Sequence, residues 1–382
     1  MSVDETDTDR LTFLIANFRK PKGTVTAYLN TAAESLYFQP HVEAFESYAS
    51  CKSSGSEGRS ALIKIEDETR NLVANLIGVA AENVIFLSST SRCLDVVIKS
   101  IKWQEGDNIV FSDTEFLTTE FTGALLKQHG ILTKIVRSNH GYLTPEDYEK
   151  EIDSRTRLVV ASSVSYKTGL ILDVEGVSRV TKAKGALLFL DGIQALGSVD
   201  TTAKYADFFA SGTFKWLFGM HGLSIFYVNP LVLDRLEVPY VGYHSVSRMF
   251  TPNRTSEFEL WPDARRFQEG LPNYAGICLL RSSLTAIQEV GIERIFEKNR
   301  SLMRTLLSEL EKIGIQPFGH DMPNRHSPIV AFETQDFERI GTSLISSGII
   351  VWARDGRVRI SPHFYNSESD IFRFSSTLRS IL

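Results

Sequence analysis

Residues 186–191 read ALLFLD and residues 206–216 read ADFFASGTFKW, and these two stretches decide the fold. Each is a short apolar run that ends in polar residues, as is typical of a strand buried on both faces. The first run ends in Asp191, with Gln194 soon after it, and the second leads to Lys215. Ligands bind outside the carboxyl ends of parallel strands. We therefore expect these three side chains to meet at one edge of a sheet.

The same pattern extends over about residues 60–230, where short apolar runs alternate with amphipathic stretches. Further strands are predicted at 84–87, 108–112, 131–136 and 158–163, with an amphipathic helix between the first two. Short runs rich in Val, Ile, Leu and Phe, separated by helices, indicate a largely parallel sheet. The sequence therefore predicts an α/β fold with its chemistry at the carboxyl ends of the strands.

The alternation of short apolar runs with amphipathic stretches ends at about residue 240. A long helical region covers about residues 274–313, and shorter strands and a last helix follow it. We interpret this part as a smaller α+β domain that packs with the N-terminal arm. The predicted organisation is an N-terminal arm at 1–24, a large domain at 25–240 and a small C-terminal domain at 241–382.

Composition limits the possible partners. The chain has 382 residues, of which 43% are hydrophobic and 23% charged, as in ordinary water-soluble proteins of about two domains. Its net charge of -5 and its pI near 6.0 argue against nucleic acid, because phosphate backbones need a basic surface. Apolar runs stay shorter than the ~20 residues that span a bilayer, so no membrane partner is expected.

The cysteines and the N-terminus indicate the compartment. Cys51, Cys93 and Cys278 lie far apart, which fits neither a disulfide framework nor a zinc site. We therefore expect no metal, and a reducing cytoplasm. The first ten residues, MSVDETDTDR, are acidic and polar and do not read as a signal peptide.

A carboxylate and a lysine at neighbouring strand ends suit pyridoxal 5'-phosphate (PLP). This cofactor needs a lysine amine for its Schiff base and an acidic partner that keeps the pyridine nitrogen protonated. Taken alone, Asp191 would more often cap a helix, and Lys215 would more often be a solvated surface residue. However, Lys215 lies between Phe214 and Trp216 in an apolar stretch, where a surface lysine is unusual. We therefore predict a PLP site on Asp191 and Lys215, with Gln194 bonded to the ring hydroxyl.

The phosphate of PLP needs a site of its own, and residues 86–97 (FLSSTSRCLDVV) offer one. Ser88, Ser89, Thr90 and Ser91 lie between a predicted strand and a predicted helix. Backbone N–H groups at a helix N-terminus bind anions, and hydroxyl groups add donors. The segment alone is better explained as a plain N-cap. Beside the predicted lysine and carboxylate it supports a phosphate site.

Four motifs carry a family resemblance: LDGIQALG (190–197), GTFKWLFGMHGLSIFYV (212–228), ARRFQEGLPNYAG (264–276) and VRISPHFYN (358–366). With them the chain resembles, over about residues 25–380, the class V aminotransferase group of fold-type I PLP-dependent enzymes. That group includes cysteine desulfurases, selenocysteine lyases, kynureninases and isopenicillin N epimerase-like proteins. The resemblance implies a mostly parallel, seven-stranded sheet flanked by helices in the large domain, and a homodimer with the site at the subunit interface.

The resemblance also implies roles for the residues that match. Lys215 matches the Schiff-base lysine, and Asp191 and Gln194 match the partners of the pyridine nitrogen and ring oxygen. Thr90 and Ser91 match the pair at the phosphate-binding turn.

Two further residues match positions that contact the ring and the substrate. Phe116 matches the position of the ring that stacks on the cofactor. Arg359 matches the arginine that binds the substrate carboxylate, a role suited to a guanidinium fork.

Several positions depart from the family pattern. Cysteine desulfurases usually have histidine where this chain has Phe116, and they carry a nucleophilic cysteine shortly before the carboxylate-binding arginine. Residues 346–359 (SSGIIVWARDGRVR) contain no cysteine, and a persulfide relay needs that thiolate. We therefore do not expect a cysteine desulfurase.

Leu271 stands where the family often has a threonine that reaches the phosphate of the neighbouring subunit. A leucine cannot donate this hydrogen bond, and Ser211 and Thr213 are the candidate replacements. Tyr166 lies near the place where some members bring an asparagine to the ring oxygen, so it is expected near the ring or in the substrate pocket. His221 is either a second acid/base or a loop histidine, and the loop interpretation is favoured.

These observations predict a PLP-dependent enzyme that acts on an amino acid through Lys215. Transfer of the substrate amine to the cofactor is the shared first step, after which the freed lysine is placed to act as a base at Cα. We expect β-elimination of the C–S type, since several of the enzymes it resembles are lyases. Transamination and epimerisation remain open, as does a fold that binds PLP without turnover.

Overall fold

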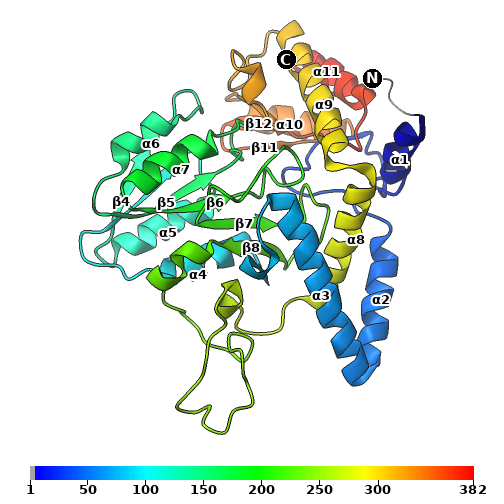
Figure 1. Ribbon diagram of the computed structural model, residues 1–382. Helices are drawn as coiled ribbons and strands as arrows, with labels where there is room; N and C mark the ends of the chain where they lie inside the picture. The colour runs from blue at the N-terminus through cyan, green and yellow to red at the C-terminus, as the bar shows by residue number, and fades with distance from the viewer. Residues whose placement is uncertain (1–4) are drawn as a thin grey trace.

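Seven strands form the central sheet of the computed structural model, which describes residues 5–382 (Figure 1). Their spatial order is β2-β8-β7-β6-β5-β3-β4, and β8 runs antiparallel to both of its neighbours while the others share one direction. The strands are β2 (Val84–Leu87), β3 (Asn108–Ser112), β4 (Leu132–Val136), β5 (Thr156–Ser162), β6 (Leu187–Asp191), β7 (Phe208–Gly212) and β8 (Ser224–Val228). The predicted α/β fold with a mostly parallel sheet is confirmed.

Side chains alternate along the strands between two hydrophobic cores, one on each face of the sheet. On one face, the side chains of Val84, Phe86, Ile225 and Tyr227 pack against helices. Ile85, which lies between Val84 and Phe86 on β2, points to the other face and belongs to the other core. The helices of the first face are α3 (Gly55–Ile77), α6 (Pro145–Glu151), α7 (Val174–Ala183) and α8 (Tyr274–Val290). Those of the second face are α4 (Thr90–Ser100) and α5 (Leu117–Lys127).

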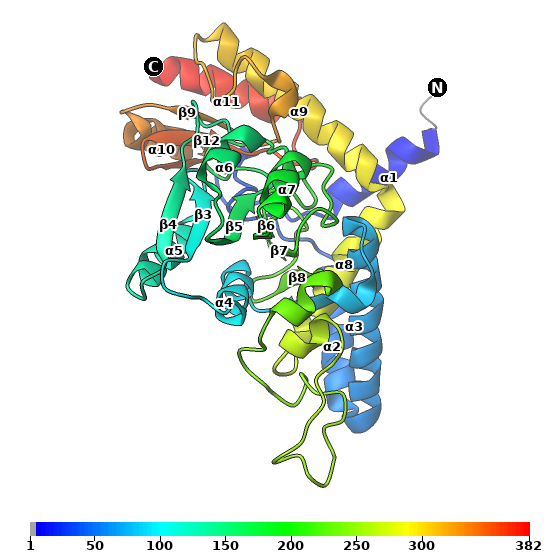
Figure 2. The same cartoon turned by 60° about the vertical axis from the view of Figure 1, so that its left-hand side comes forward.

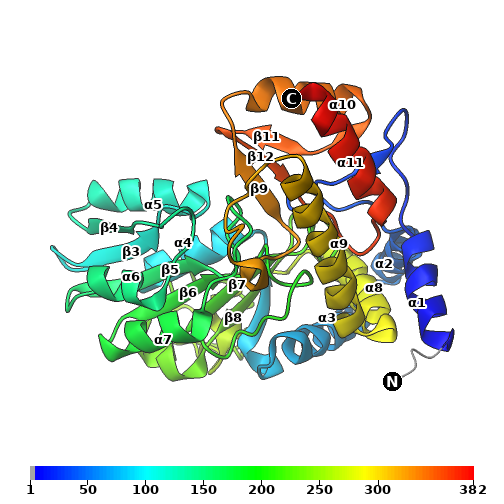
Figure 3. The same ribbon diagram turned by 90° about the horizontal axis from the view of Figure 1, so that it is seen from above.

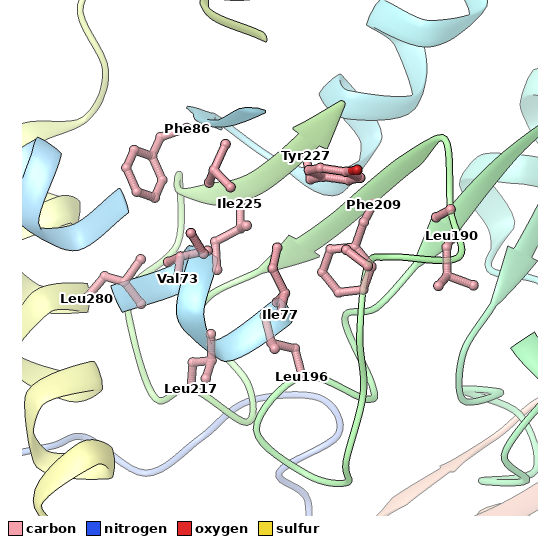
Figure 4. Packing of buried hydrophobic residues seen from close by; sticks show 14 of the residues in the cluster. Val73, Ile77, Phe86, Leu190, Leu196, Phe209, Leu217, Ile225, Tyr227 and Leu280 are labelled. Carbon is pink, nitrogen blue, oxygen red and sulfur yellow. The ribbon is translucent and has the colours of Figure 1, made fainter. Parts of the chain in front are cut away.

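Figure 4 shows part of the first core, where Val73 and Ile77 of α3 and Leu280 of α8 lie against Phe86 and Ile225 of the sheet. All five of these side chains are buried. Helices on both faces leave the carboxyl edge of the sheet as the place where polar strand ends can meet a ligand.

The C-terminal part forms a second, smaller layer over one end of the sheet (Figure 3). It contains an antiparallel sheet of order β11-β12-β9, built from β9 (Val330–Glu333), β11 (Trp352–Arg354) and β12 (Arg357–Ile360). Helices α9 (Ile292–Lys312), α10 (Phe337–Ser346) and α11 (Glu368–Ile381) complete it.

Segments near the N-terminus contact both parts. Strand β1 (Ala27–Tyr28) pairs in parallel with β10 (Ile349–Ile350), whereas α1 (Glu5–Ala16) and α2 (His41–Ser53) lie beside α8. Domain boundaries at residues 24 and 240 stay a prediction. Within the described residues, no helix is both long and apolar enough to cross a membrane, and no group of side chains is arranged to hold a metal ion.

The segment between η2 (Pro230–Arg235) and η3 (Ala264–Phe267) is a long loop that projects from the body of the molecule (Figure 2). One isolated bridge, Val246 to Leu260, joins its two limbs. Several large apolar side chains on it are exposed, among them Tyr243, Phe250 and Phe258.

Candidate active site

A cavity of about 280 Å³ lies at the carboxyl edge of the sheet, where β5, β6 and β7 end. Its wall combines the ends of these strands with the starts of α4 and α5 and with the loop that precedes β8. The structure brings six of the predicted site residues together on this wall: Thr90, Ser91, Phe116, Asp191, Gln194 and Lys215.

Lys215 follows the end of β7 and is 8% exposed. Its Nζ lies 5.6 Å from the centre of the Phe214 ring. Burial, and then the positive charge of Arg359, lower the pKa of Lys215, while Asp191 and Glu34 act against this shift. The amine is therefore much easier to deprotonate than that of a solvated lysine, as a base or nucleophile requires.

Asp191 is the last residue of β6, beside Ala210 of β7. One oxygen of its carboxyl group, Oδ1, accepts a hydrogen bond of 2.9 Å from the backbone N–H of Ile193. Burial raises the pKa of Asp191, whereas this hydrogen bond and the charge of Lys215 oppose the shift. A cation at the cavity side of Asp191 would relieve the cost of burying the carboxylate.

The Gln194 amide is held between two partners. Its Nε2 donates to the carbonyl of Ala32 at 3.0 Å, and its Oε1 accepts from the Trp216 indole at 2.8 Å. An amide nitrogen has two protons, so one remains for a ligand. Gln194 thereby also links the loop after β6 to the segment beyond β1.

Ser89 is the N-cap of α4, and its hydroxyl accepts from the backbone N–H of Arg92 at 3.1 Å. Ser91 Oγ lies 2.9 Å from Thr118 Oγ1, at the start of α5. The Thr90 hydroxyl is buried and has no hydrogen-bond partner within residues 5–382. An unpaired buried donor beside free N–H groups of a helix start suits an anionic ligand.

Phe116 and Tyr166 form the aromatic part of the wall. Their ring centres are 5.1 Å apart, and the rings meet edge to face at 79°. Phe116 directly precedes α5 and is 45% exposed, so a flat ligand has access to its ring.

Arg359, on β12, lies outside the residues that line the cavity. Its Nη1 donates to the Tyr166 carbonyl at 3.0 Å, and its guanidinium lies 4.9 Å from the centre of the Trp352 ring. Its Nε is buried and has no partner in the described part of the chain. Burial, and then the charge of Arg357, lower the pKa of Arg359 to about 10.

Ser211, Thr213 and Leu271 also lie outside the residues that line the cavity. The Ser211 hydroxyl donates to the Gly212 carbonyl, and the Thr213 hydroxyl faces the carbonyls of Met220 and Leu223. Their roles as replacements for a contact at Leu271 stay a prediction.

Two acidic residues of this region were missed by sequence reasoning. Glu34 Oε2 lies 2.9 Å from Nε2 of His221, which lines the cavity and stacks on Phe214 at 4.4 Å between ring centres. Glu34 comes from the segment after β1, and no local pattern marks it. Glu115 is buried just after β3, and its place at a strand end was the signal available in the sequence.

Comparison with known proteins agrees with this geometry. The family model described as "Aminotransferase class-V" matches residues 27–375. A "Probable cysteine desulfurase" of Pyrococcus abyssi is 25% identical over 381 residues, covering 93% of this chain and 94% of that protein. An uncharacterized aminotransferase of Bacillus subtilis is 24% identical, covering 90% and 91%.

Solved structures show the same fold. The apo cysteine desulfurase from Thermococcus onnurineus NA1 has a TM-score of 0.84 at 24% identity, covering 93% of this chain and 94% of that one. The cystine C–S lyase C-DES, in complex with its reaction product cysteine persulfide, has a TM-score of 0.83 at 18% identity, covering 92% and 97%. The family match spans all three sheets and every element of the cavity wall. The chain therefore belongs to the aminotransferase class V family of PLP-dependent enzymes.

Proposed function

We propose that this chain is a PLP-dependent lyase that eliminates a β-substituent, of the C–S type, from an amino acid. One observation carries the proposal: a single cavity gathers a buried lysine, the partly buried carboxyl group of Asp191 and a hydroxyl-rich helix start. Lys215 would hold the cofactor through a Schiff base to its amine.

The residues present fit the cofactor. The buried Thr90 hydroxyl without a partner and the capped start of α4 suit the phosphate group. Asp191 suits a protonated ring nitrogen, because a cation beside it offsets the cost of its burial. Phe116 offers a ring face for stacking, and Gln194 retains one amide proton for the ring oxygen.

When bound, PLP would supply an electron-withdrawing ring that stabilises negative charge at the Cα of the amino acid. Burial favours the neutral amine of Lys215, which can accept the Cα proton near neutral pH. In this proposal Arg359, whose buried Nε has no partner within the described residues, would bind the substrate carboxylate. Asp191 would stabilise a positive charge on the ring nitrogen of the bound cofactor.

The cysteines support elimination without a protein-bound persulfide. The curated relatives include proteins named cysteine desulfurase, and a neighbour of the same fold is named a cystine C–S lyase. Cys51, Cys93 and Cys278 are free, and none of them belongs to the described wall of the cavity. Burial raises the pKa of Cys93 to about 12, which makes it a poor nucleophile. In this proposal the sulfur leaves as a small molecule.

We also propose a homodimer in a reducing cytoplasm. The exposed apolar side chains of the projecting loop support an interface there, and the free cysteines suit a reducing compartment. The molar mass in solution, from light scattering after gel filtration, tests the dimer. A monomer at micromolar concentration would contradict it.

The first experiment is the visible absorption spectrum after incubation with PLP. Wild type and Lys127→Ala, an exposed lysine of α5, should both show a band that Lys215→Ala lacks. A band that persists in Lys215→Ala would contradict the assignment of Lys215 as the cofactor-binding lysine. The absence of a band in wild type would contradict the assignment of PLP as the cofactor.

The second experiment identifies the reaction of the PLP-loaded protein with cysteine and with cystine. Elimination should yield pyruvate and ammonium in equal amounts, together with sulfide or a persulfide. With an α-keto acid added as acceptor, its conversion to the corresponding amino acid without release of sulfur would indicate transamination instead. Exchange of the Cα proton with loss of optical rotation alone would indicate epimerisation.

A further inference from the structure

Glu115 is a buried carboxyl group that the proposed chemistry leaves unused. It is 2% exposed and lies between the end of β3 and the start of α5. Three donors face it: the Ser162 backbone N–H at 3.0 Å from Oε1, the Ser112 hydroxyl at 3.2 Å from Oε1, and the Ser162 hydroxyl at 2.6 Å from Oε2. None of these partners is a cation.

The ionisable groups that face Glu115 do not supply a positive charge. Asp191 on β6 adds a second negative charge, and the Tyr148 hydroxyl approaches from α6. Lys167, on the loop after β5, donates instead to the Asp113 carbonyl and to Glu120. Burial therefore raises the pKa of Glu115 to about 7, with the charge of Asp191 adding to the shift and the Ser162 hydroxyl opposing it.

Ser162 connects this carboxyl group to the cofactor cavity. It is the last residue of β5, lies opposite Asp191 in the sheet register, and lines the main cavity. It also lines a second cavity of about 20 Å³, together with Glu115, Tyr142 and Ser165. That volume is large enough for one water molecule among polar groups, through which Glu115 could exchange its proton away from the ligand.

The direction of the Ser162 hydroxyl depends on the proton of Glu115. A charged Glu115 accepts the Ser162 O–H at Oε2. A protonated Glu115 donates to Ser162 Oγ over the same 2.6 Å, while Oε1 still accepts from the Ser162 N–H. The Ser162 hydroxyl group is then free to rotate and to donate its proton into the cavity that this residue lines.

We propose that Glu115 is a positioning residue that keeps its proton while Asp191 is charged, and that it thereby turns the Ser162 hydroxyl into the cofactor cavity. The pair of buried carboxyl groups then carries one negative charge at the sheet edge instead of two. The inference rests on the proposed function, in which Asp191 faces the ring nitrogen of PLP.

The test uses Glu115→Gln, which imitates the protonated carboxyl group, since its Nε2 can donate to Ser162 Oγ and its Oε1 can accept from the Ser162 N–H. We expect the visible band of PLP-loaded wild type to change with an inflection near neutral pH. Glu115→Gln should lack this inflection, and Glu120→Gln, a half-buried residue of the adjacent helix α5, should keep it. An inflection that persists in Glu115→Gln, or is missing from wild type, overturns the proposal.

A second measurement needs no cofactor: the Tm of wild type and Glu115→Gln at a series of pH values. When a carboxyl group stays protonated in the folded state but ionises in the unfolded chain, the folded protein loses stability as pH rises from the unfolded pKa to the folded pKa of that group. Glu115→Gln should therefore gain in Tm over wild type between about pH 4.5 and pH 7, and the gain should then level off.

The two measurements separate the two hypotheses. A wild type that shows no PLP band contradicts the proposed function, but the Tm comparison still tests the proton on Glu115. A difference in Tm between wild type and Glu115→Gln that stays constant from about pH 4.5 to pH 7 would show that Glu115 is already charged there, and would overturn the inference.

Discussion

Asp191 is the residue whose charge matters most to the proposed chemistry. Asp191→Asn keeps the shape of the side chain and lacks the carboxylate, so it cannot hold a positive ring nitrogen. We expect kcat to fall by about 10²- to 10³-fold, the usual loss when one preorganised electrostatic group is removed. Steady-state kinetics at saturating PLP measure the loss, and the visible band shows whether Lys215 still holds the cofactor.

Asp207 provides the matched control for this substitution. It is another buried aspartate beside β6, and its Oδ2 accepts the Leu188 backbone N–H at 2.8 Å. Asp207→Asn should lower the stability and leave kcat of the folded fraction within a few fold. Equal loss of kcat in both variants would show that Asp191 acts only through the fold.

Arg359 is expected to act on binding of the substrate carboxylate. Arg359→Lys keeps a positive charge and loses the planar fork. Loss of one charged hydrogen bond corresponds to about a tenfold to hundredfold rise in KM for the amino acid, with a smaller change in kcat. Arg357→Lys is the control, because Arg357 lies two residues away on β12 and pairs with Asp355. A larger KM effect in the control would reassign the carboxylate site.

Among single residues, the positions of Asp191 and Lys215 could be predicted from the sequence, because each lies at or just after the end of an apolar run at the carboxyl edge of the sheet. Ser211 and Thr213 also lie near Lys215 in sequence, but their hydroxyls turn to backbone carbonyls. The direction of a short polar side chain depends on the strand pleat and on tertiary neighbours. Glu34 could not be predicted, because only the tertiary fold brings it close to His221, which lies far away in the sequence.

Helix α4 joins stability and cofactor binding in one element. The N-cap hydroxyl of Ser89 stabilises its first turn, and the same residue lines the cavity. Ser89→Ala should lower the free energy of unfolding by about 1 kcal/mol. It should also weaken PLP binding, because the first turn would hold its N–H groups less firmly. Denaturant unfolding and a fluorescence titration with PLP measure the two effects.

Thr144→Ala is the control at the start of α6, where Thr144 forms a capping box with Asp147. It should cost a similar amount of stability and leave the affinity for PLP unchanged. If both variants weaken PLP binding equally, the effect belongs to general loosening of the fold and not to the helix start.

The strands themselves could be predicted well from sequence, because buried runs such as residues 108–112 match the structure. Strand β8 was not predicted, although its SIFYV sequence is as apolar as the others. Its antiparallel direction follows from its insertion between β2 and β7, which only the pairing of distant segments decides. Local pattern therefore fixes the existence of a strand more readily than its place in the sheet.

At the scale of the whole molecule, the N-terminal segments connect the part that holds the central sheet with the C-terminal part. Strand β1 pairs with β10, and α2 lies against α8, so residues early in the chain brace elements near its end. Sequence periodicity predicted a helix after the first strand, a helical region at about 274–313 and a last helix, but contacts over hundreds of residues have no local signal. One of them, between His41 and Ser283, makes the stability of the fold depend on pH.

His41 begins α2, is 2% exposed, and its Nε2 lies 2.8 Å from Ser283 Oγ of α8. Burial lowers the pKa of His41 to about 4, below its value of ~6.5 in an unfolded chain. Between these two values the unfolded state binds a proton that the folded state does not, so stability falls as pH falls from about 6.5 to about 4. The slope is about 1.4 kcal/mol per pH unit, which gives up to about 3 kcal/mol over this range.

His41→Gln retains an amide that can bond to Ser283 and has no proton to gain, so its acid sensitivity should be weaker. We expect the free energy of unfolding of wild type to fall relative to His41→Gln as pH is lowered from 6.5 to 4.5, in denaturant titrations followed by circular dichroism. His129→Gln, at an exposed position, should follow wild type. A constant difference between wild type and His41→Gln across these pH values would mean that His41 is already charged in the folded protein, and that α2 and α8 are held together by a cation instead of a neutral hydrogen bond.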